Sequence, residues 1–153
     1  MISYQVFLAK HKGNPKFIYD LLLLVTMSLK NKKVVRTVQV IFGLMNILFA
    51  ANGFFQFMPA PQFNEAGSAF LGALANTGYM IVVISLLHLV VGLLFLINRF
   101  SPLAAVLLAP FSFNILLFHL FLDFQGWYLA AIVIILNVYM LWVHKEAYKP
   151  MLK

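Results

Sequence analysis

Residues 79–97 read YMIVVISLLHLVVGLLFLI, an apolar segment interrupted only by a serine, a histidine and a glycine. A helix needs about 20 predominantly apolar residues to cross the hydrocarbon core of a bilayer. Comparable segments lie at residues 34–58, 103–122 and 128–143. The chain is 63% hydrophobic and 10% charged, and a soluble fold of this length cannot bury so much apolar surface. The sequence therefore predicts an all-α fold, a four-helix transmembrane bundle.

The distribution of charge supports four spans. All 11 Lys and Arg lie before or at the edge of the first span, between the second and third, or after the fourth. Four crossings place every one of them on the same side, and only Glu65 and Asp123 on the other. Because basic residues concentrate on the cytoplasmic side, we expect both termini in the cytoplasm. The bilayer, with its anionic headgroups, is then the partner of the basic residues, and nucleic acid is not expected.

An amphipathic segment at residues 63–77 follows the first span. The apolar residues of one helical face recur three or four positions apart: Phe63, Gly67, Phe70, Leu71 and Leu74. The segment is too short to span, so we predict a short amphipathic interfacial helix on the outer side, over the mouth of the bundle. Asn64 is the expected cap at its start, and Gly78 lies just past its end.

Residues 1–33 form a basic N-terminal segment, separate from the membrane domain at residues 34–153. Its apolar run, residues 17–29, is too short to span and contains Asp20. No small-residue cleavage site follows, which argues against a signal peptide. Two interpretations remain: a cytoplasmic interfacial helix, or translation that begins at Met27.

Each predicted span carries a polar residue near the same depth. Counting about 1.5 Å of rise per residue places His88, Asn114 and Asn137 roughly 13 Å below the outer surface. Asn46 is a little deeper and Asn52 a little shallower. Polar groups inside a bilayer face the bundle interior, so we predict one polar layer formed by His88, Asn114, Asn137 and an asparagine of the first span.

Small and polar residues mark the faces on which the first two spans pack. One face of the first span contains Gln39, Gly43, Asn46, Ala50 and Gly53. One face of the second contains Ser85, His88 and Gly92. Small residues allow helices to approach closely, so each of these faces is predicted to point into the bundle.

A second polar group lies nearer the outer surface. Ser112, His119 and Asp123 share one face of the third span, and Gln56 lies at a comparable depth. For His119, a structural bond to Asp123 or to the loop is the alternative to ligand contact. For the asparagines, hydrogen bonding between helices is favoured over ligand contact. His88 stays open between the two roles, because an ionisable group inside a membrane is a functional candidate.

Several kinds of chemistry are disfavoured. The chain has no cysteine, which excludes thiol catalysis and disulfides. No set of residues supplies a nucleophile, a base and an orienting group, so no catalytic residue is assigned and an autonomous enzyme is the least favoured class. No metal site is assigned, because carboxylates are few and peripheral. His88 and His119 differ in depth by roughly 8–9 Å, which argues against a shared haem.

Four segments carry a resemblance to a known family. They read GLMNILFAANGFFQFMPAP at residues 43–61, NTGYM at 76–80, LLHLVVGLLFLINRFSPLAAVLLAP at 86–110 and NILLFHLFLD at 114–123. Together they resemble the DoxX family of small bacterial membrane proteins, over residues 34–153. The resemblance implies a four-helix bundle in the bacterial inner (cytoplasmic) membrane.

The resemblance also implies a function. It implies a membrane protein of unassigned activity, with a non-catalytic subunit of a redox complex as the role to be tested first. A redox-complex protein would then be the partner; no cofactor is identifiable, and quinone is the class left open. Asn114, His119 and Pro110 match the family pattern most closely. The alternative is a small lipid- or hydrophobe-binding membrane module or carrier, which would use a cavity under residues 63–77.

The chain departs from the family pattern at two positions. Gln56 stands where many relatives carry lysine, and His88 stands where many carry glutamate. If the family's residues form a charge pair, the resemblance implies that a neutral pair replaces it here.

Overall fold

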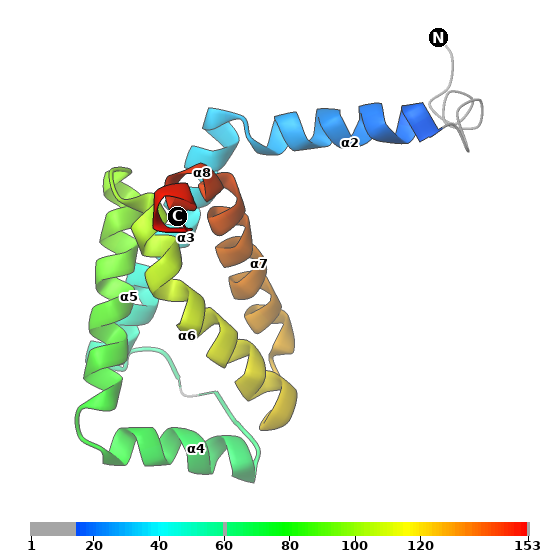
Figure 1. Ribbon diagram of the computed structural model, residues 1–153. Helices are drawn as coiled ribbons and strands as arrows, with labels where there is room; N and C mark the ends of the chain where they lie inside the picture. The colour runs from blue at the N-terminus through cyan, green and yellow to red at the C-terminus, as the bar shows by residue number, and fades with distance from the viewer. Residues whose placement is uncertain (1–14, 60, 153) are drawn as a thin grey trace. The chain divides into compact units, whose positions relative to one another are not determined.

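The computed structural model describes residues 15–59 and 61–152, and these residues form helices and connecting turns without a strand (Figure 1). The all-α prediction is therefore confirmed for this part of the chain. Two compact units are present, residues 1–35 and residues 36–153. The predictions for residues 1–14 lie outside the described residues. We call residues 36–153 the helical body.

The first unit contains helix α2, Pro15–Leu29, which coincides with the apolar run of the N-terminal segment. Its large apolar side chains are exposed, Leu22 and Leu24 among them. The chain then turns at Asn31, whose side-chain oxygen accepts a hydrogen bond of 2.9 Å from the backbone N–H of Lys33. This bond satisfies one of the N–H groups that the start of the next helix leaves without a partner.

Within residues 15–59 and 61–152, three helices are long and apolar enough to cross a membrane: α3 (Lys32–Phe55), α5 (Met80–Ile97) and α6 (Ser101–Phe121). Helix α7, Trp127–Val143, reaches that length only together with residues 145–151, from which it is bent by 68°. Those residues form α8 (Lys145–Tyr148) and the 3₁₀ turn η1 (Lys149–Leu152). Three to four helices thus have the composition and length of membrane spans.

Two glycines bring α3 and α5 together inside the helical body. A Cβ atom built on Gly92 would lie 2.8 Å from the carbonyl oxygen of Gly43 and 2.7 Å from Ile47. A Cβ on Gly43 would lie 3.1 Å from the carbonyl oxygen of Gly92. The predicted packing faces therefore meet, at a separation that only glycine allows at these two positions.

Two polar side chains near the start of α3 form hydrogen bonds with the end of α5. The guanidinium of Arg36 donates to the carbonyl oxygens of Phe95 and Leu96, at 3.0 and 2.8 Å. The amide of Gln39 donates to the Phe95 carbonyl at 2.7 Å and to Asn98 Oδ1 at 2.8 Å. These bonds satisfy carbonyls that the last turn of a helix leaves free.

Helix α4, Glu65–Asn76, lies crosswise to α5 and α6 at the other end of the helical body (Figure 1). The side chain of Asn64 caps it by accepting a hydrogen bond of 2.8 Å from Gly67 N–H, and the same side chain donates to the carbonyl of Leu122 at 2.6 Å. Gly78 follows with φ of 75°. The predicted helix and both of its end signals are confirmed.

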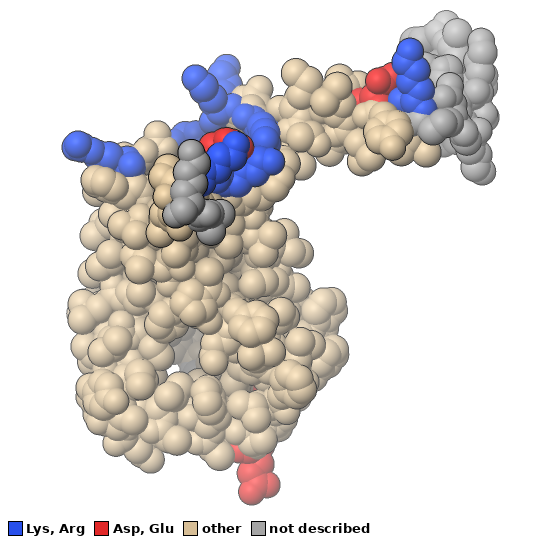
Figure 2. Space-filling model, viewed as in Figure 1, with Lys and Arg blue, Asp and Glu red and all other residues tan. Residues whose placement is uncertain are grey.

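Charged residues of the helical body lie at its two ends. Arg36 contacts the end of α5, Arg99 follows α5, and Lys145 follows α7. The hydroxyl of Tyr148 donates to the carbonyl of Pro102 at 3.0 Å, which places α8 beside the start of α6. Between this end and α4, the face seen in Figure 2 shows no charged side chain. An uncharged band of this kind suits the hydrocarbon core of a bilayer.

The first predicted span ends earlier than expected. Helix α3 stops at Phe55, whereas the sequence predicted a span up to residue 58. Gln56 adopts a positive φ of 48°, and the side chain of Asn52 accepts a hydrogen bond of 2.8 Å from Met58 N–H. The amide of Asn52 therefore stabilises the turn that leaves the helix, and apolar composition alone could not locate that turn.

Candidate functional site

Two adjoining cavities lie beneath α4, between α4, α5 and α6. One has a volume of about 280 Å³ and the other about 300 Å³. Five residues line both cavities: Phe70, Leu74, Ile84, Phe111 and Asn114. On the face seen in Figure 2, the surface is hollowed beside α4. We call the two together the α4 cavity; its lining is apolar apart from a few polar side chains.

His88 reaches the α4 cavity from α5, although only 7% of the residue is exposed. Its Nδ1 lies 2.8 Å from Oδ1 of Asn46 on α3. The Asn46 amide nitrogen donates in turn to the carbonyl of Phe42 at 2.8 Å. The ring of Phe49 meets the imidazole edge to face. Two members of the predicted polar layer, Asn46 and His88, are therefore bonded to each other across α3 and α5.

Asn137 and Asn114 do not complete this layer as predicted. The buried side chain of Asn137 donates to the backbone carbonyl of Ala105 at 3.0 Å, so it joins α7 to α6. Asn114 is an exposed residue that lines both parts of the α4 cavity. The bond expected between helices is therefore confirmed for Asn137, but neither this residue nor the exposed Asn114 bonds to the Asn46–His88 pair, because their side chains leave α7 and α6 in other directions.

His119 lines the α4 cavity from the last turn of α6. Its Nδ1 lies 2.9 Å from the backbone carbonyl oxygen of Asp123, which confirms the expected bond to Asp123 but assigns it to the main chain. The Asp123 side chain is buried, and its Oδ1 accepts from Gln125 N–H at 3.3 Å. Since α6 ends at Phe121, Asp123 lies beyond the helix face on which the sequence placed it.

The remaining predicted site residues lie apart from the cavity lining. Ser85 is buried and donates to the carbonyl of Ile81 at 2.7 Å, and a Cβ on Gly53 would collide with its hydroxyl. Ser112 is fully buried in α6, without a hydrogen-bond partner among the described residues. Gln56 is exposed in the turn after α3, whereas the hydrogen bond of His88 goes to Asn46. The implied neutral pair of Gln56 and His88 is therefore not formed.

Sequence reasoning missed most of the apolar lining. Ile81 and Ile84 precede His88 by seven and four residues, and Phe111 and Phe118 lie on the same side of α6 as Asn114. Helical periodicity from the polar residues already singled out would have located them. The part of the lining that α4 supplies was predictable from the sequence. Its residues Phe70, Leu71 and Leu74 belong to the apolar helical face that was predicted to cover the bundle.

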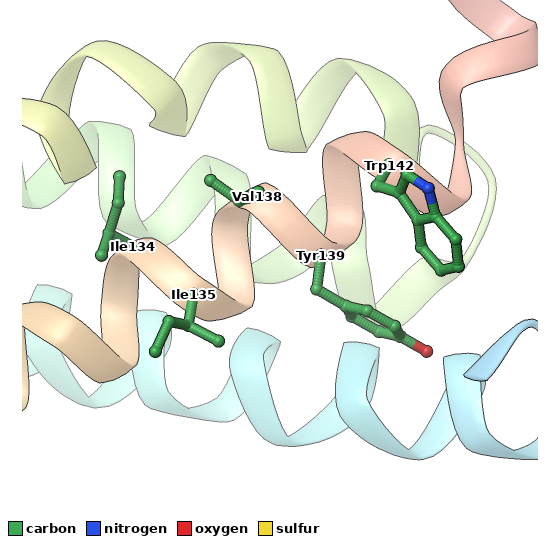
Figure 3. A pocket seen from close by; sticks show the side chains of 5 residues that line it. All are labelled: Ile134, Ile135, Val138, Tyr139 and Trp142. Carbon is green, nitrogen blue, oxygen red and sulfur yellow. The ribbon is translucent and has the colours of Figure 1, made fainter. Parts of the chain in front are cut away.

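A separate hollow lies along α7 (Figure 3). It has a volume of about 340 Å³ and is lined by Ile134, Ile135, Val138, Tyr139 and Trp142. These side chains project from one helix, and none of them is an imidazole or an amide. Such a surface suits contact with lipid chains, whereas the lining of the α4 cavity combines apolar side chains from three helices with two imidazoles and an amide.

Comparison of the chain with models of protein families, with curated proteins and with solved structures finds no match. The arrangement of the site therefore carries the functional argument.

Proposed function

We propose that the chain is a DoxX-like, four-span protein of the bacterial inner membrane that binds a small hydrophobic molecule in the α4 cavity. The observation that carries the proposal is the cavity itself. Ligand sites are commonly concave, mostly apolar and roughly 300–1,000 Å³ in volume, with a few polar groups that orient the ligand. Here Phe70, Leu74 and Phe111 supply apolar walls, and His88, Asn114 and His119 supply polar contacts.

The position of the cavity supports a ligand drawn from the bilayer. It lies within helices of membrane-spanning length, near the end that α4 covers. Met80 and Pro110 line the part of the cavity that His88 does not reach. A proline inside a helix removes one backbone hydrogen bond, and here the carbonyl of Val106 loses its helical partner. Such a break favours an opening between α5 and α6 through which an apolar molecule enters from the side.

Mass spectrometry of organic extracts from the mildly purified protein tests this function. Leu74 lines both parts of the cavity, so Leu74→Trp should fill the space. Leu120→Trp is the matched control, because Leu120 is 53% exposed on the same helix as Phe111 and lies outside the lining. We expect one hydrophobe enriched in the wild type and the control and lost in Leu74→Trp. Equal extracts from all three proteins would exclude the α4 cavity as its site.

The redox-subunit role implied by the DoxX resemblance is the second candidate. The observation that favours it is the presence of two imidazoles on one apolar cavity, since the hydroxyl groups of a reduced quinone need polar contacts in such a place. This role requires a partner protein that carries the redox centre. Crosslinking in intact membranes, followed by purification under mild conditions, should then capture an oxidoreductase together with a quinone. Recovery of the chain with neither would count against this candidate and leave the first intact.

A further inference from the structure

The hydrogen bonds of the two cavity histidines fix which ring nitrogen carries the proton. Asn46 donates through Nδ2 to the carbonyl of Phe42, because a carbonyl oxygen only accepts. The atom that Asn46 presents to His88 is therefore Oδ1, which also only accepts. Nδ1 of His88 must then be the donor. In a neutral ring the other nitrogen, Nε2, is left with a lone pair.

His119 reaches the same state through a different partner. Its Nδ1 faces the backbone carbonyl of Asp123 at 2.9 Å, so Nδ1 again carries the hydrogen. The turn at Gly126 lies against this edge of the ring, 3.3 Å from Cε1 and 3.9 Å from Nδ1 for a Cβ built on the glycine. No carboxylate lines the part of the cavity that both rings share, and the nearest one along the chain is the buried side chain of Asp123, whose Oδ2 has no hydrogen-bond partner among the described residues. With the hydrogen on Nδ1, Nε2 is the acceptor in the neutral form of each ring.

The cavity therefore offers acceptors at two points, from two helices, inside an apolar wall. A ligand with only acceptor oxygens, such as an ether, an ester or a quinone, places lone pair against lone pair at both histidines. A hydroxyl group supplies the missing hydrogen. Asn114 lines the same cavity, and its side-chain amide both donates and accepts. Its NH₂ group can therefore donate a hydrogen bond to the oxygen of the same hydroxyl.

We propose, resting on the proposed hydrophobe site, that the α4 cavity selects a hydrophobic molecule bearing a hydroxyl donor, which His88 or His119 accepts at Nε2. The shared chemistry is an O–H group on an apolar body. Two sources carry it in a membrane: an aliphatic alcohol of the lipid class and a phenolic hydroquinone with an alkyl tail.

Binding of matched probes to the protein in vesicles tests the proposal and separates the two sources. The probes are a long-chain alcohol and its methyl ether, and decylhydroquinone and its dimethyl ether. Loss of one hydrogen bond lowers affinity by roughly threefold to tenfold, so each hydroxyl probe should be retained over its ether by that factor. The better retained of the two hydroxyl probes identifies the source.

The possible failures are distinguishable. Equal retention of a hydroxyl probe and its ether, or preference for the ether, would overturn the donor requirement and leave the hydrophobe site standing. Retention of none of the four probes, with Leu74→Trp indistinguishable from wild type, would overturn the site and this inference together.

A second test changes which ring nitrogen of His88 carries the hydrogen. In Asn46→Leu, Nδ1 of His88 loses its acceptor, so Nε2 is free to carry the hydrogen and the preference for hydroxyl probes should fall. Asn137→Leu is the matched control, since Asn137 is equally buried but bonds to Ala105 outside the cavity. Imidazole ¹⁵N spectra of the wild-type protein read the protonated nitrogen directly. Nδ1–H on both cavity rings is expected, and Nε2–H on His88 and His119 would overturn the inference even if no variant folds.

Discussion

Gly92 shows how single residues set the distance between α3 and α5. A methyl group there would meet the Gly43 carbonyl at 2.8 Å, and a backbone atom cannot move aside as a flexible side chain can. Overpacking of this kind costs about 1–3 kcal/mol of unfolding free energy. We expect Gly92→Ala to lower the thermal stability of the protein in detergent micelles accordingly.

The control for this substitution lies in α4. A Cβ at Gly72 meets no atom within 4 Å, and alanine is the better helix former by up to about 1 kcal/mol. Gly72→Ala should therefore be neutral or stabilising. If Gly92→Ala were equally well tolerated, α3 and α5 would not cross as closely as described.

The Asn46–His88 hydrogen bond should appear as an energetic coupling. Both residues are buried, so removal of either side chain leaves the other without its partner. In a cycle of Asn46→Leu, His88→Leu and the double variant, we expect the double variant to be more stable than the sum of the single losses by about 0.5–3 kcal/mol. Unfolding in mixed micelles measures the terms, and strict additivity would contradict the bond.

The direction of the polar side chains was only partly predictable at this scale. Asn46 and His88 lie on faces that also carry Gly43 and Gly92, so their meeting followed from the small residues around them. Helices α6 and α7 are apolar on nearly every side, which leaves no sequence contrast between a face toward lipid and one toward a cavity. The bond of Asn137 to Ala105 and the exposure of Asn114 therefore required the structure.

At the scale of elements, α4 depends on Asn64. Its side chain caps the helix at Gly67 and also binds the carbonyl of Leu122, so one residue fixes both the start of α4 and its attachment after α6. Asn64→Ala should cost about 0.5–2 kcal/mol from the cap alone. We expect faster hydrogen exchange over residues 65–76 and weaker retention of any cavity ligand.

Asn76 provides the comparison for Asn64→Ala. It is the exposed last residue of α4 and caps nothing at the start of the helix. Asn76→Ala should leave exchange in α4 near the wild-type rate. Identical exchange in both variants would mean that Asn64 does not hold α4 in place.

The elements themselves were largely predictable, because apolar segments, the amphipathic spacing at residues 63–77 and the Asn64 and Gly78 signals all locate helices directly. The residues at which helices end were less predictable than the helices themselves. The stop at Phe55 depends on the Asn52 side chain binding Met58 N–H, and the bend after α7 separates two segments that hydropathy alone joins.

At the scale of the whole molecule, the proposed four crossings make a topological prediction. Single cysteines in place of Glu65 and Phe124 should react with a membrane-impermeant thiol reagent added outside the cell, and one in place of Arg99 should not. Phe124 is 63% exposed, whereas its neighbour Asp123 is 2% exposed and a poor site for labelling. Because the native chain contains no cysteine, each signal reports one position. Outside labelling at Arg99 would contradict the orientation.

The central claim is that the α4 cavity, not the hollow along α7, binds the hydrophobe. The most direct measurement is photolabelling of the protein in vesicles with a long-chain alcohol that carries a photoactivatable group on its tail, followed by mass-spectrometric mapping of the adducts. The account predicts saturable adducts on cavity residues such as Phe70, Leu74 and Phe111, and their loss in Leu74→Trp. Adducts confined to Ile135, Val138 and the rest of the α7 hollow, with none in the cavity, would contradict it.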